Sequence, residues 1–167
     1  MKVYFAHGKE SGSWGSKIRR LAKVAADYGY EIESIDYSDL TDPDLRVKRL
    51  LKVINNEDEK IILVGSSMGG YVSLEASEQV QVKGLFLLAP ALFMPGYEKQ
   101  LYGCRCQHIE VVHGWSDDVI PVEHSIKFSK QTDCYLHLIS GDHRLNDSIE
   151  LVVNVFENFL VRNSANY

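Results

Sequence analysis

The sequence has few cysteines, no long run of like charge and no long apolar run. Three cysteines in 167 residues form no disulfide framework and favour a reducing compartment. The longest apolar stretch, residues 85–95, contains Pro90 and is shorter than the ~20 residues of a membrane span. A net charge of −5 argues against nucleic acid as a partner. With no signal-peptide pattern at the amino terminus, we expect a cytoplasmic protein without a membrane span.

The chain alternates short β-rich runs with segments of helical spacing. Its length and its hydrophobic content of 45% are typical of a single domain spanning residues 1–167. This alternation predicts an α/β fold with a mostly parallel sheet, covered on both faces, whose ligands bind at the carboxyl ends of the strands. The β-rich runs are Lys2–His7, Glu31–Tyr37, Lys60–Ser66, Val82–Ala89, Ile109–His113 and Cys134–Ile139.

Apolar residues mark the buried faces of the intervening helices. One predicted face carries Ile18, Leu21, Ala22, Ala25 and Tyr28. Similar spacing recurs around residues 47–54 and 152–159. Pro121 stands where a further helix would have proline in its first turn.

The segment IILVGSSMGG, residues 61–70, ends a predicted strand with two adjacent serines. Only Ser67 has glycine two positions away on both sides, at Gly65 and Gly69; Ser66 does not. This is the G-x-S-x-G spacing of a nucleophile elbow, a sharp strand-to-helix turn that exposes the serine hydroxyl and admits only small neighbours. The pattern predicts Ser67 as a nucleophile. Taken alone, it also fits a glycine-rich turn whose serine caps a helix.

A serine hydroxyl becomes nucleophilic when a histidine takes its proton and a carboxylate orients that histidine. Downstream of Ser67 lie HGWSDDVIP at residues 113–121 and GDHRL at 141–145, each after a predicted strand. Both segments therefore belong to the same sheet edge as Ser67, in the order serine, acid, histidine. Among the six histidines, only His143 combines this order with a strand-end loop. His7 and His113 are expected to be buried structural residues.

Together these segments resemble the α/β-hydrolase superfamily, specifically a small lidless serine esterase-like hydrolase. The matching segments span nearly the whole chain in the family's order: HG at 7–8, GSSMG at 65–69, HGWSDDVIP at 113–121 and GDH at 141–143. The resemblance implies a minimal three-layer α/β/α fold with about six strands, lacking the family's first two. Residues 92–107, where larger relatives insert a lid, are too few for one, so we expect no lid domain.

The resemblance also assigns the acid and the base. In the family pattern H-G-x-x-D-x-x-x-P the acid falls on Asp117, and the histidine of the G-D-H loop is His143. Asp118 is the alternative acid by a one-residue shift, and is otherwise a carboxylate at a turn or helix start. Asp142 is expected to bind its own loop.

An oxyanion hole needs two backbone N–H donors. One is expected at Met68, which follows the nucleophile. The resemblance implies that Lys9, just after HG in the loop HGKESGSWGSK, supplies the other, with Glu10 as the alternative.

Two other interpretations of the sequence are weaker. The loop from Gly8 lacks P-loop spacing, because Gly12 comes one place early and no lysine follows it. Cys104, Cys106 and His108 alternate and could form part of a zinc site, but no second Cys or His pair has zinc-like spacing. We therefore expect neither a cofactor nor a metal.

The resemblance implies a serine hydrolase that cleaves a carboxylic ester with a small or exposed acyl group through an acyl-enzyme. A thioesterase or an amide hydrolase would use the same residues. A non-catalytic binding protein on a hydrolase scaffold is a further alternative, because a fold alone does not fix a function. The complete set of serine, acid and histidine favours an enzyme acting on a small molecule. The sequence leaves the oligomeric state open.

Overall fold

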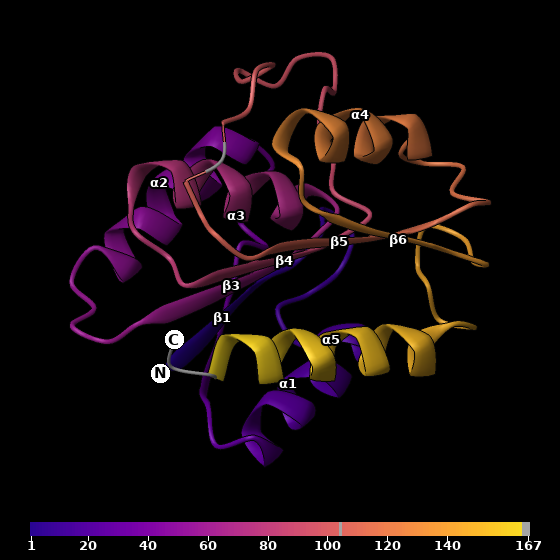
Figure 1. The fold of residues 1–167 in the computed structure, drawn as a ribbon. Coiled ribbons are helices and arrows are strands. Elements are labelled where there is room, and N and C mark those ends of the chain that lie inside the picture. The colour runs from indigo at the N-terminus through magenta and orange to yellow at the C-terminus, as the bar shows by residue number, and fades with distance from the viewer. Residues whose placement is uncertain (104, 165–167) are drawn as a thin grey trace.

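The computed structural model describes residues 1–103 and 105–164. It has a parallel sheet between two layers of helices (Figure 1). In chain order the elements are β1 (Lys2–Ala6), α1 (Ser16–Asp27), β2 (Glu31–Ile35), α2 (Pro43–Ile54), β3 (Ile61–Ser66), α3 (Met68–Gln79), β4 (Gly84–Leu88), β5 (Ile109–Gly114), α4 (Val122–Thr132), β6 (Tyr135–Ile139) and α5 (Ile149–Ser164). Every predicted strand is present, with ends shifted by one or two residues.

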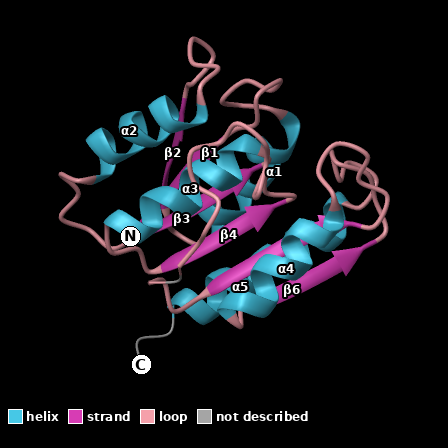
Figure 2. Ribbon diagram, turned by 90° about the horizontal axis from the view of Figure 1, so that it is seen from above, coloured by secondary structure: helices cyan, strands magenta, loops and turns pink. Residues whose placement is uncertain are grey.

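The six strands lie in the order β2-β1-β3-β4-β5-β6, and each neighbouring pair is parallel. This confirms the predicted α/β/α fold with six strands. Seen from above, β2 and β6 lie at opposite sides of the twisted sheet (Figure 2). The strand order reverses direction at β1 and β3, and in such sheets this switch point opens a crevice beyond the carboxyl ends of the strands. The loop after β3 begins at this switch point.

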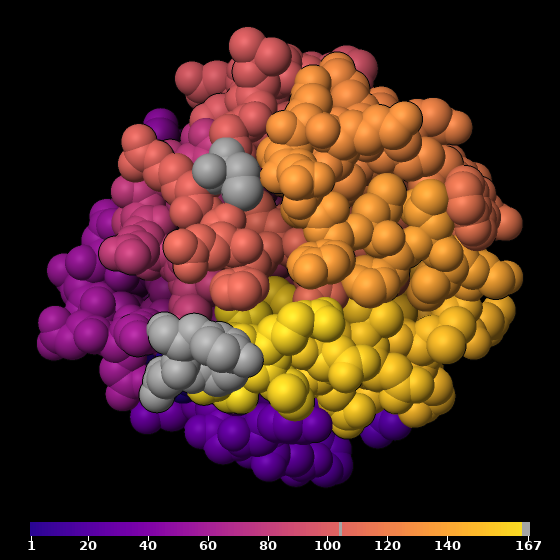
Figure 3. All heavy atoms as spheres, viewed as in Figure 1, coloured from indigo at the N-terminus to yellow at the C-terminus, as the bar shows by residue number. Residues whose placement is uncertain are grey.

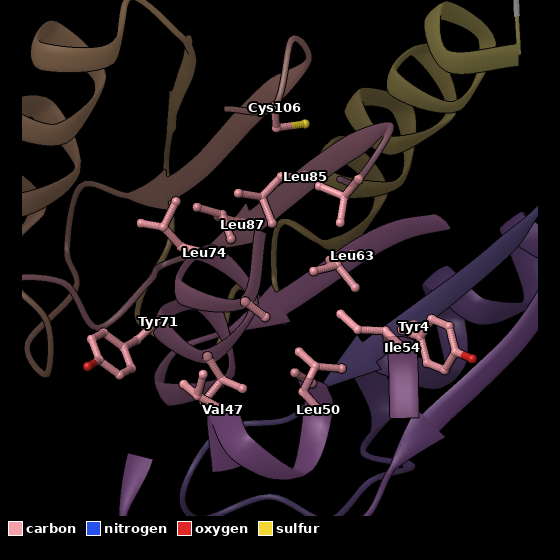
Figure 4. Packing of buried hydrophobic residues seen from close by; sticks show 14 of the residues in the cluster. Tyr4, Val47, Leu50, Ile54, Leu63, Tyr71, Leu74, Leu85, Leu87 and Cys106 are labelled. Atoms are coloured by element: carbon pink, nitrogen blue, oxygen red, sulfur yellow. The ribbon is translucent and has the colours of Figure 1, made fainter. Parts of the chain in front are cut away.

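Alternation along the strands divides the core into two halves. Tyr4 and Ala6 of β1 belong to the cluster under α2 and α3, whereas Val3 and Phe5 belong to the cluster with α1 and α5. Successive side chains of a strand point to opposite faces, so a sheet covered on both sides needs continuous apolar strands. Figure 4 shows the first cluster, where α2 and α3 side chains gather over β3 and β4: Val47, Leu50, Leu63, Leu74, Leu85 and Leu87.

Helix ends follow local chemistry and correct two predictions. The Asp42 side chain accepts hydrogen bonds from the backbone of the first turn of α2, which opens with Pro43, a favoured combination. Helix α1 ends at Asp27, before Gly29 with φ of 80°. Tyr28 therefore lies beyond the helix and is 46% exposed, not on its buried face. Pro121 precedes α4 rather than lying in its first turn.

The segment between β4 and β5 forms no helix or strand among its described residues, 89–103 and 105–108. It packs on α3, where the ring of Tyr97 lies 4.8 Å from that of Tyr71 and Lys99 forms an ion pair with Glu78 at 2.5 Å. The described residues thus form no separate lid domain, as predicted. In the described part of the chain, no helix is long and apolar enough to cross a membrane. In the space-filling view, α5 lies at the surface below α4 (Figure 3).

Candidate active site

Ser67 lies at the sharp turn between β3 and α3. Its φ of 55° and ψ of −119° are unfavourable for a residue with a side chain, at a cost of ~1–3 kcal/mol. Two hydrogen bonds of 2.9 Å hold this conformation: the N–H of Ser67 donates to Leu88, and its carbonyl accepts from Ala91. Ser67 therefore has the strained strand-to-helix turn expected from its sequence pattern, and this turn is anchored to the end of β4 and the residues after it.

The glycines around Ser67 are required by close backbone packing. A Cβ on Gly65 would lie 2.3 Å from the carbonyl oxygen of Gly69, and one on Gly69 would lie 2.0 Å from that of Ala6. Helix α3 thus begins directly against β1 and β3. A Cβ on Gly8 would be 3.4 Å from Ser67 Cβ, so the loop after β1 passes beside the serine.

The structure brings Ser67, His143 and Asp117 into hydrogen-bonding contact, although they come from three separate loops at one sheet edge. The hydroxyl of Ser67 donates to Nε2 of His143 at 3.1 Å. The Nδ1–H of His143 donates to Oδ2 of Asp117 at 2.7 Å. The imidazole side chain is 18% exposed and the carboxylate is fully buried, so solvent reaches the chain of hydrogen bonds at His143 and Ser67 but not at the acid.

Asp117 is held as an anion by donors on both oxygens. Its Oδ1 accepts from the backbone N–H groups of Val119 and Ile120, each at 2.8 Å. Its Oδ2 lies 2.9 Å from Nε2 of His113 as well as contacting His143. Burial on its own raises the pKa of Asp117, but the Ile120 N–H and His143 oppose it, and the net pKa is lowered. The carboxylate is therefore charged at neutral pH.

The alternative acids lie elsewhere. Asp118 is exposed and, among the described residues, makes no hydrogen bond to His143. The Oδ1 of Asp142 accepts from the backbone N–H groups of Arg144 and Leu145 at 2.9 and 3.0 Å. It closes its own loop, which is the behaviour expected of an aspartate at a turn.

The expected oxyanion donors lie near Ser67, but their role stays a prediction. Met68 is the first residue of α3, where backbone N–H groups have no acceptor within the helix. Lys9 follows Gly8 in the exposed loop beside Ser67. In the described part of the chain, neither backbone N–H donates to another protein group. Glu10, the alternative, is exposed in the same loop.

Two cations that the sequence patterns did not single out hold the loops of the site. Arg46 of α2, only 2% exposed, donates from Nη1 to the carbonyl oxygens of His7 and Gly8 at 3.1 and 3.3 Å. Lys17 of α1 donates to the carbonyl oxygen of Arg144 at 3.1 Å. Burial lowers the pKa of Lys17 to about 8. Both basic residues occupy ordinary helical positions, so no local pattern distinguishes them.

The candidate zinc ligands form no site among the described residues. Cys104 lies outside those residues. Cys106 is buried, with its Sγ 3.5 Å from the carbonyl oxygen of His108. Within residues 1–103 and 105–164, no three His, Cys, Asp or Glu side chains are grouped as metal ligands.

Comparison with solved structures identifies the class of protein. A candidate hydrolase of the alpha/beta superfamily from Xanthomonas campestris pv. campestris is 31% identical, with a TM-score of 0.88 over 96% of this chain and 98% of its own. Est1E from Butyrivibrio proteoclasticus is 21% identical, with a TM-score of 0.84 over 98% of this chain and 88% of its own. It is also known with ferulic acid bound. The chain is an α/β hydrolase by fold.

Its membership can be stated more narrowly. A family model described as "Uncharacterised protein family (UPF0227)" matches residues 1–102, which is more than half of the chain, and the protein belongs to that family. Mouse alpha/beta hydrolase domain-containing protein 10 shares the fold, with 18% identity and a TM-score of 0.76 over 96% of this chain and 90% of its own. No curated protein sequence matches the chain. Membership of the superfamily, predicted from the motifs, is thus confirmed.

Proposed function

We propose that the protein is a serine hydrolase that cleaves carboxylic esters through an acyl-enzyme, with Ser67, His143 and Asp117 as its catalytic triad. One observation carries the proposal: the continuous contact from Ser67 Oγ through both nitrogens of His143 to Asp117 Oδ2, at 3.1 and 2.7 Å. These distances lie within the range for proton transfer between a nucleophile and its base. The hydrolase fold and the strained backbone of Ser67 support the same conclusion.

In the proposed reaction, Ser67 Oγ attacks the carbonyl carbon of the ester and its proton passes to His143 Nε2. Asp117 keeps the Nδ1–H of His143 oriented and stabilises the imidazolium. The backbone N–H groups of Met68 and Lys9 stabilise the negative oxygen of the tetrahedral intermediate. His143 then protonates the leaving alcohol. A water molecule, deprotonated by His143, releases the carboxylic acid and restores Ser67.

The surroundings of Ser67 favour a small or exposed acyl group. The segment between β4 and β5 packs on α3 through Tyr97 and Lys99, and its described residues form no helix above the serine. A long acyl chain gains affinity when its surface is buried in a deep, apolar pocket. Here the ester would instead bind at an open sheet edge. Short acyl esters are therefore the preferred substrates, and hydroxycinnamate esters merit a test because Est1E binds ferulic acid.

The first test is labelling of the folded protein with a fluorophosphonate probe. We expect wild type to be labelled and Ser67→Ala and His143→Ala to lose the label. Ser66→Ala is the matched control, since it removes the neighbouring hydroxyl without touching the contact to His143, and it should retain labelling. Absence of labelling in a folded wild type would favour a binding protein on this scaffold instead.

The second test compares substrates. Acetyl, butyryl, octanoyl and feruloyl esters would be assayed beside acetyl and butyryl thioesters with wild type and Ser67→Ala. The proposal predicts that kcat/KM is highest for a short ester and falls ~10³-fold or more in the serine variant. Thioesters turned over faster than the matching esters would replace esterase by thioesterase with the same residues.

A further inference from the structure

His113 lies behind the acid of the proposed triad. It is a fully buried residue near the end of β5, four positions before Asp117. Its Nε2 lies 2.9 Å from Oδ2 of Asp117 and 3.1 Å from the carbonyl oxygen of Ile120. On the other side of the ring, Nδ1 lies 2.7 Å from the hydroxyl of Ser125, a buried residue of α4.

These neighbours determine where the ring carries its proton. An ionised carboxylate and a carbonyl oxygen only accept hydrogen bonds, so Nε2 of His113 must bear hydrogen. Burial lowers the pKa of His113, which keeps the imidazole neutral and leaves Nδ1 without a proton. Nδ1 therefore accepts the hydroxyl proton of Ser125. The ring is fixed as the Nε2–H tautomer, with the carbonyl oxygen of Ile120 and Oδ2 of Asp117 both within reach of that donor.

The oxygen that His113 reaches is the one that His143 uses. Oδ1 of Asp117 accepts from two backbone N–H groups, whereas Oδ2 lies 2.7 Å from Nδ1 of His143 and 2.9 Å from Nε2 of His113. A second donor withdraws negative charge from Oδ2 and lowers its basicity. It also leaves His143 a single direction of approach to that oxygen.

We propose that His113 is a positioning residue of the active site, which donates Nε2–H to Asp117 Oδ2 and thereby sets the orientation and proton affinity of His143. The catalytic part of this proposal rests on the proposed function; the hydrogen bonding does not. Without the donor, the charge of Oδ2 acts on His143 alone and stabilises its imidazolium more strongly. His143 would then become neutral, and able to act as a base, only at higher pH.

The other charged residues near the site are left unchanged by the substitutions at His113. Lys17 of α1 interacts electrostatically with Asp117 and with Asp142. Arg144 is next to His143 in the loop after β6 and is exposed. Because none of these groups is changed when His113 is replaced, a shift in the pH response reports the loss of the donor at Asp117.

The test compares two amides of different reach. In His113→Gln the amide nitrogen takes the place of ring Nε2 and can still donate to Asp117. In His113→Asn the amide ends where ring Nδ1 lay and cannot reach. We expect the Asn variant to lower kcat/KM for a short ester at pH 7 by about 10-fold to 100-fold, the range for loss of such supporting partners, with KM little changed. The acid limb of its pH profile should move up by about 0.5 pH unit or more. Gln should recover most of both effects.

His137→Asn is the matched control. It breaks a histidine–carboxylate contact of the same 2.9 Å, to Glu110 on the adjoining strand, and should leave the acid limb in place. In an Asp117→Asn background, His113→Asn should cost nothing further, since its action passes through the carboxylate. A loss of activity in His113→Asn with an unmoved acid limb would assign His113 a purely structural role and overturn the proposal.

A measurement on the wild type needs neither turnover nor a folded variant. Nitrogen-15 NMR of the histidine rings distinguishes the two tautomers, and we expect His113 as neutral Nε2–H at pH 7–8, above its lowered pKa. The Nδ1–H tautomer would refute the proposal directly. The two proposals can fail separately. If the protein cleaves no ester, the proposed function fails. The positioning role still stands in that case if His113 is the Nε2–H tautomer and His113→Asn shifts the titration of His143.

Discussion

The packing of α3 on β1 gives a sharp prediction for Gly69→Ala. The added methyl carbon would lie 2.0 Å from the carbonyl oxygen of Ala6, 2.4 Å from the carbonyl carbon of that residue and 2.8 Å from the carbonyl oxygen of His7. All three neighbours are backbone atoms in or just after a central strand. No rotation of a side chain can relieve the contact, so α3 must move away from β1.

The size of that movement sets the cost. Non-bonded heavy atoms are stable at ~3.5–4.0 Å, so relief requires a shift of about 1.5 Å at the turn that carries Ser67. Overpacking in a well-packed core costs ~1–3 kcal/mol, and a rigid backbone neighbour puts Gly69→Ala at or above the top of this range. In Gly70→Ala the new carbon meets Pro90 Cβ at 2.7 Å, a lesser conflict, for which we expect about 1–2 kcal/mol.

Urea unfolding followed by circular dichroism measures these differences. Gly12→Ala is the control, because nothing lies within 4 Å of its added carbon, and its free energy of unfolding should stay within ~0.5 kcal/mol of wild type. The expected order of stability is Gly12→Ala, then Gly70→Ala, then Gly69→Ala. If Gly69→Ala were as stable as Gly12→Ala, the close approach of α3 to β1 would be wrong.

Three further predictions follow from the charges. Asp117→Asn should reduce kcat for the ester ~10³–10⁴-fold, whereas Asp118→Asn, at an exposed position, should change it less than about threefold. Burial lowers the pKa of His7 from 6.5, so on acidification His7 binds a proton in the unfolded chain before it does so in the folded protein. As the pH drops below 6.5, the free energy of unfolding should therefore decrease by up to ~1.4 kcal/mol per pH unit. The decrease should be less steep in His7→Asn. The pKa of Lys17 is about 8 against 10.5 unfolded, so wild type should gain stability from pH 8 to 10.5 relative to Lys17→Met, as measured by urea unfolding at each pH.

The fold could be predicted because its strands are defined by composition. Residues 61–64 and 85–88 are continuously apolar, and in the structure they are buried on both faces of the sheet. Because a strand of this kind has no polar face, its sequence predicts burial on both sides of the sheet. The helix ends were harder, as Tyr28 shows: its spacing continues the apolar stripe of α1, but the chain turns at Gly29 with a positive φ. The periodicity of apolar residues therefore does not indicate the residue at which a helix ends.

The candidate site also has parts that the sequence predicted and contacts that it did not predict. Motif spacing and chain order indicated Ser67 and His143, and the resemblance to the α/β-hydrolase pattern indicated Asp117. The structure places the three in contact, while their catalytic role and the oxyanion donors stay predictions. His113 was expected to be buried and structural; its contact with Asp117 depends on how the turn after β5 folds back. Two residues of the H-G-x-x-D segment thus meet at one carboxylate oxygen. A distance of four residues along a turn does not predict that contact, because the intervening backbone decides which side chains converge.

The two cations around the site explain how an open edge without a lid can still hold its loops. Arg46 reaches from α2 to the loop after β1, and Lys17 reaches from α1 to the loop that carries His143. These helices cover opposite faces of the sheet (Figure 1). Arg46 donates to the carbonyl oxygens of His7 and Gly8, and Lys17 donates to that of Arg144, so each layer of helices holds one loop of the candidate site. Loss of the Lys17 contact should therefore loosen the loop that carries His143, whereas loss of the Arg46 contact should loosen the loop that carries Lys9.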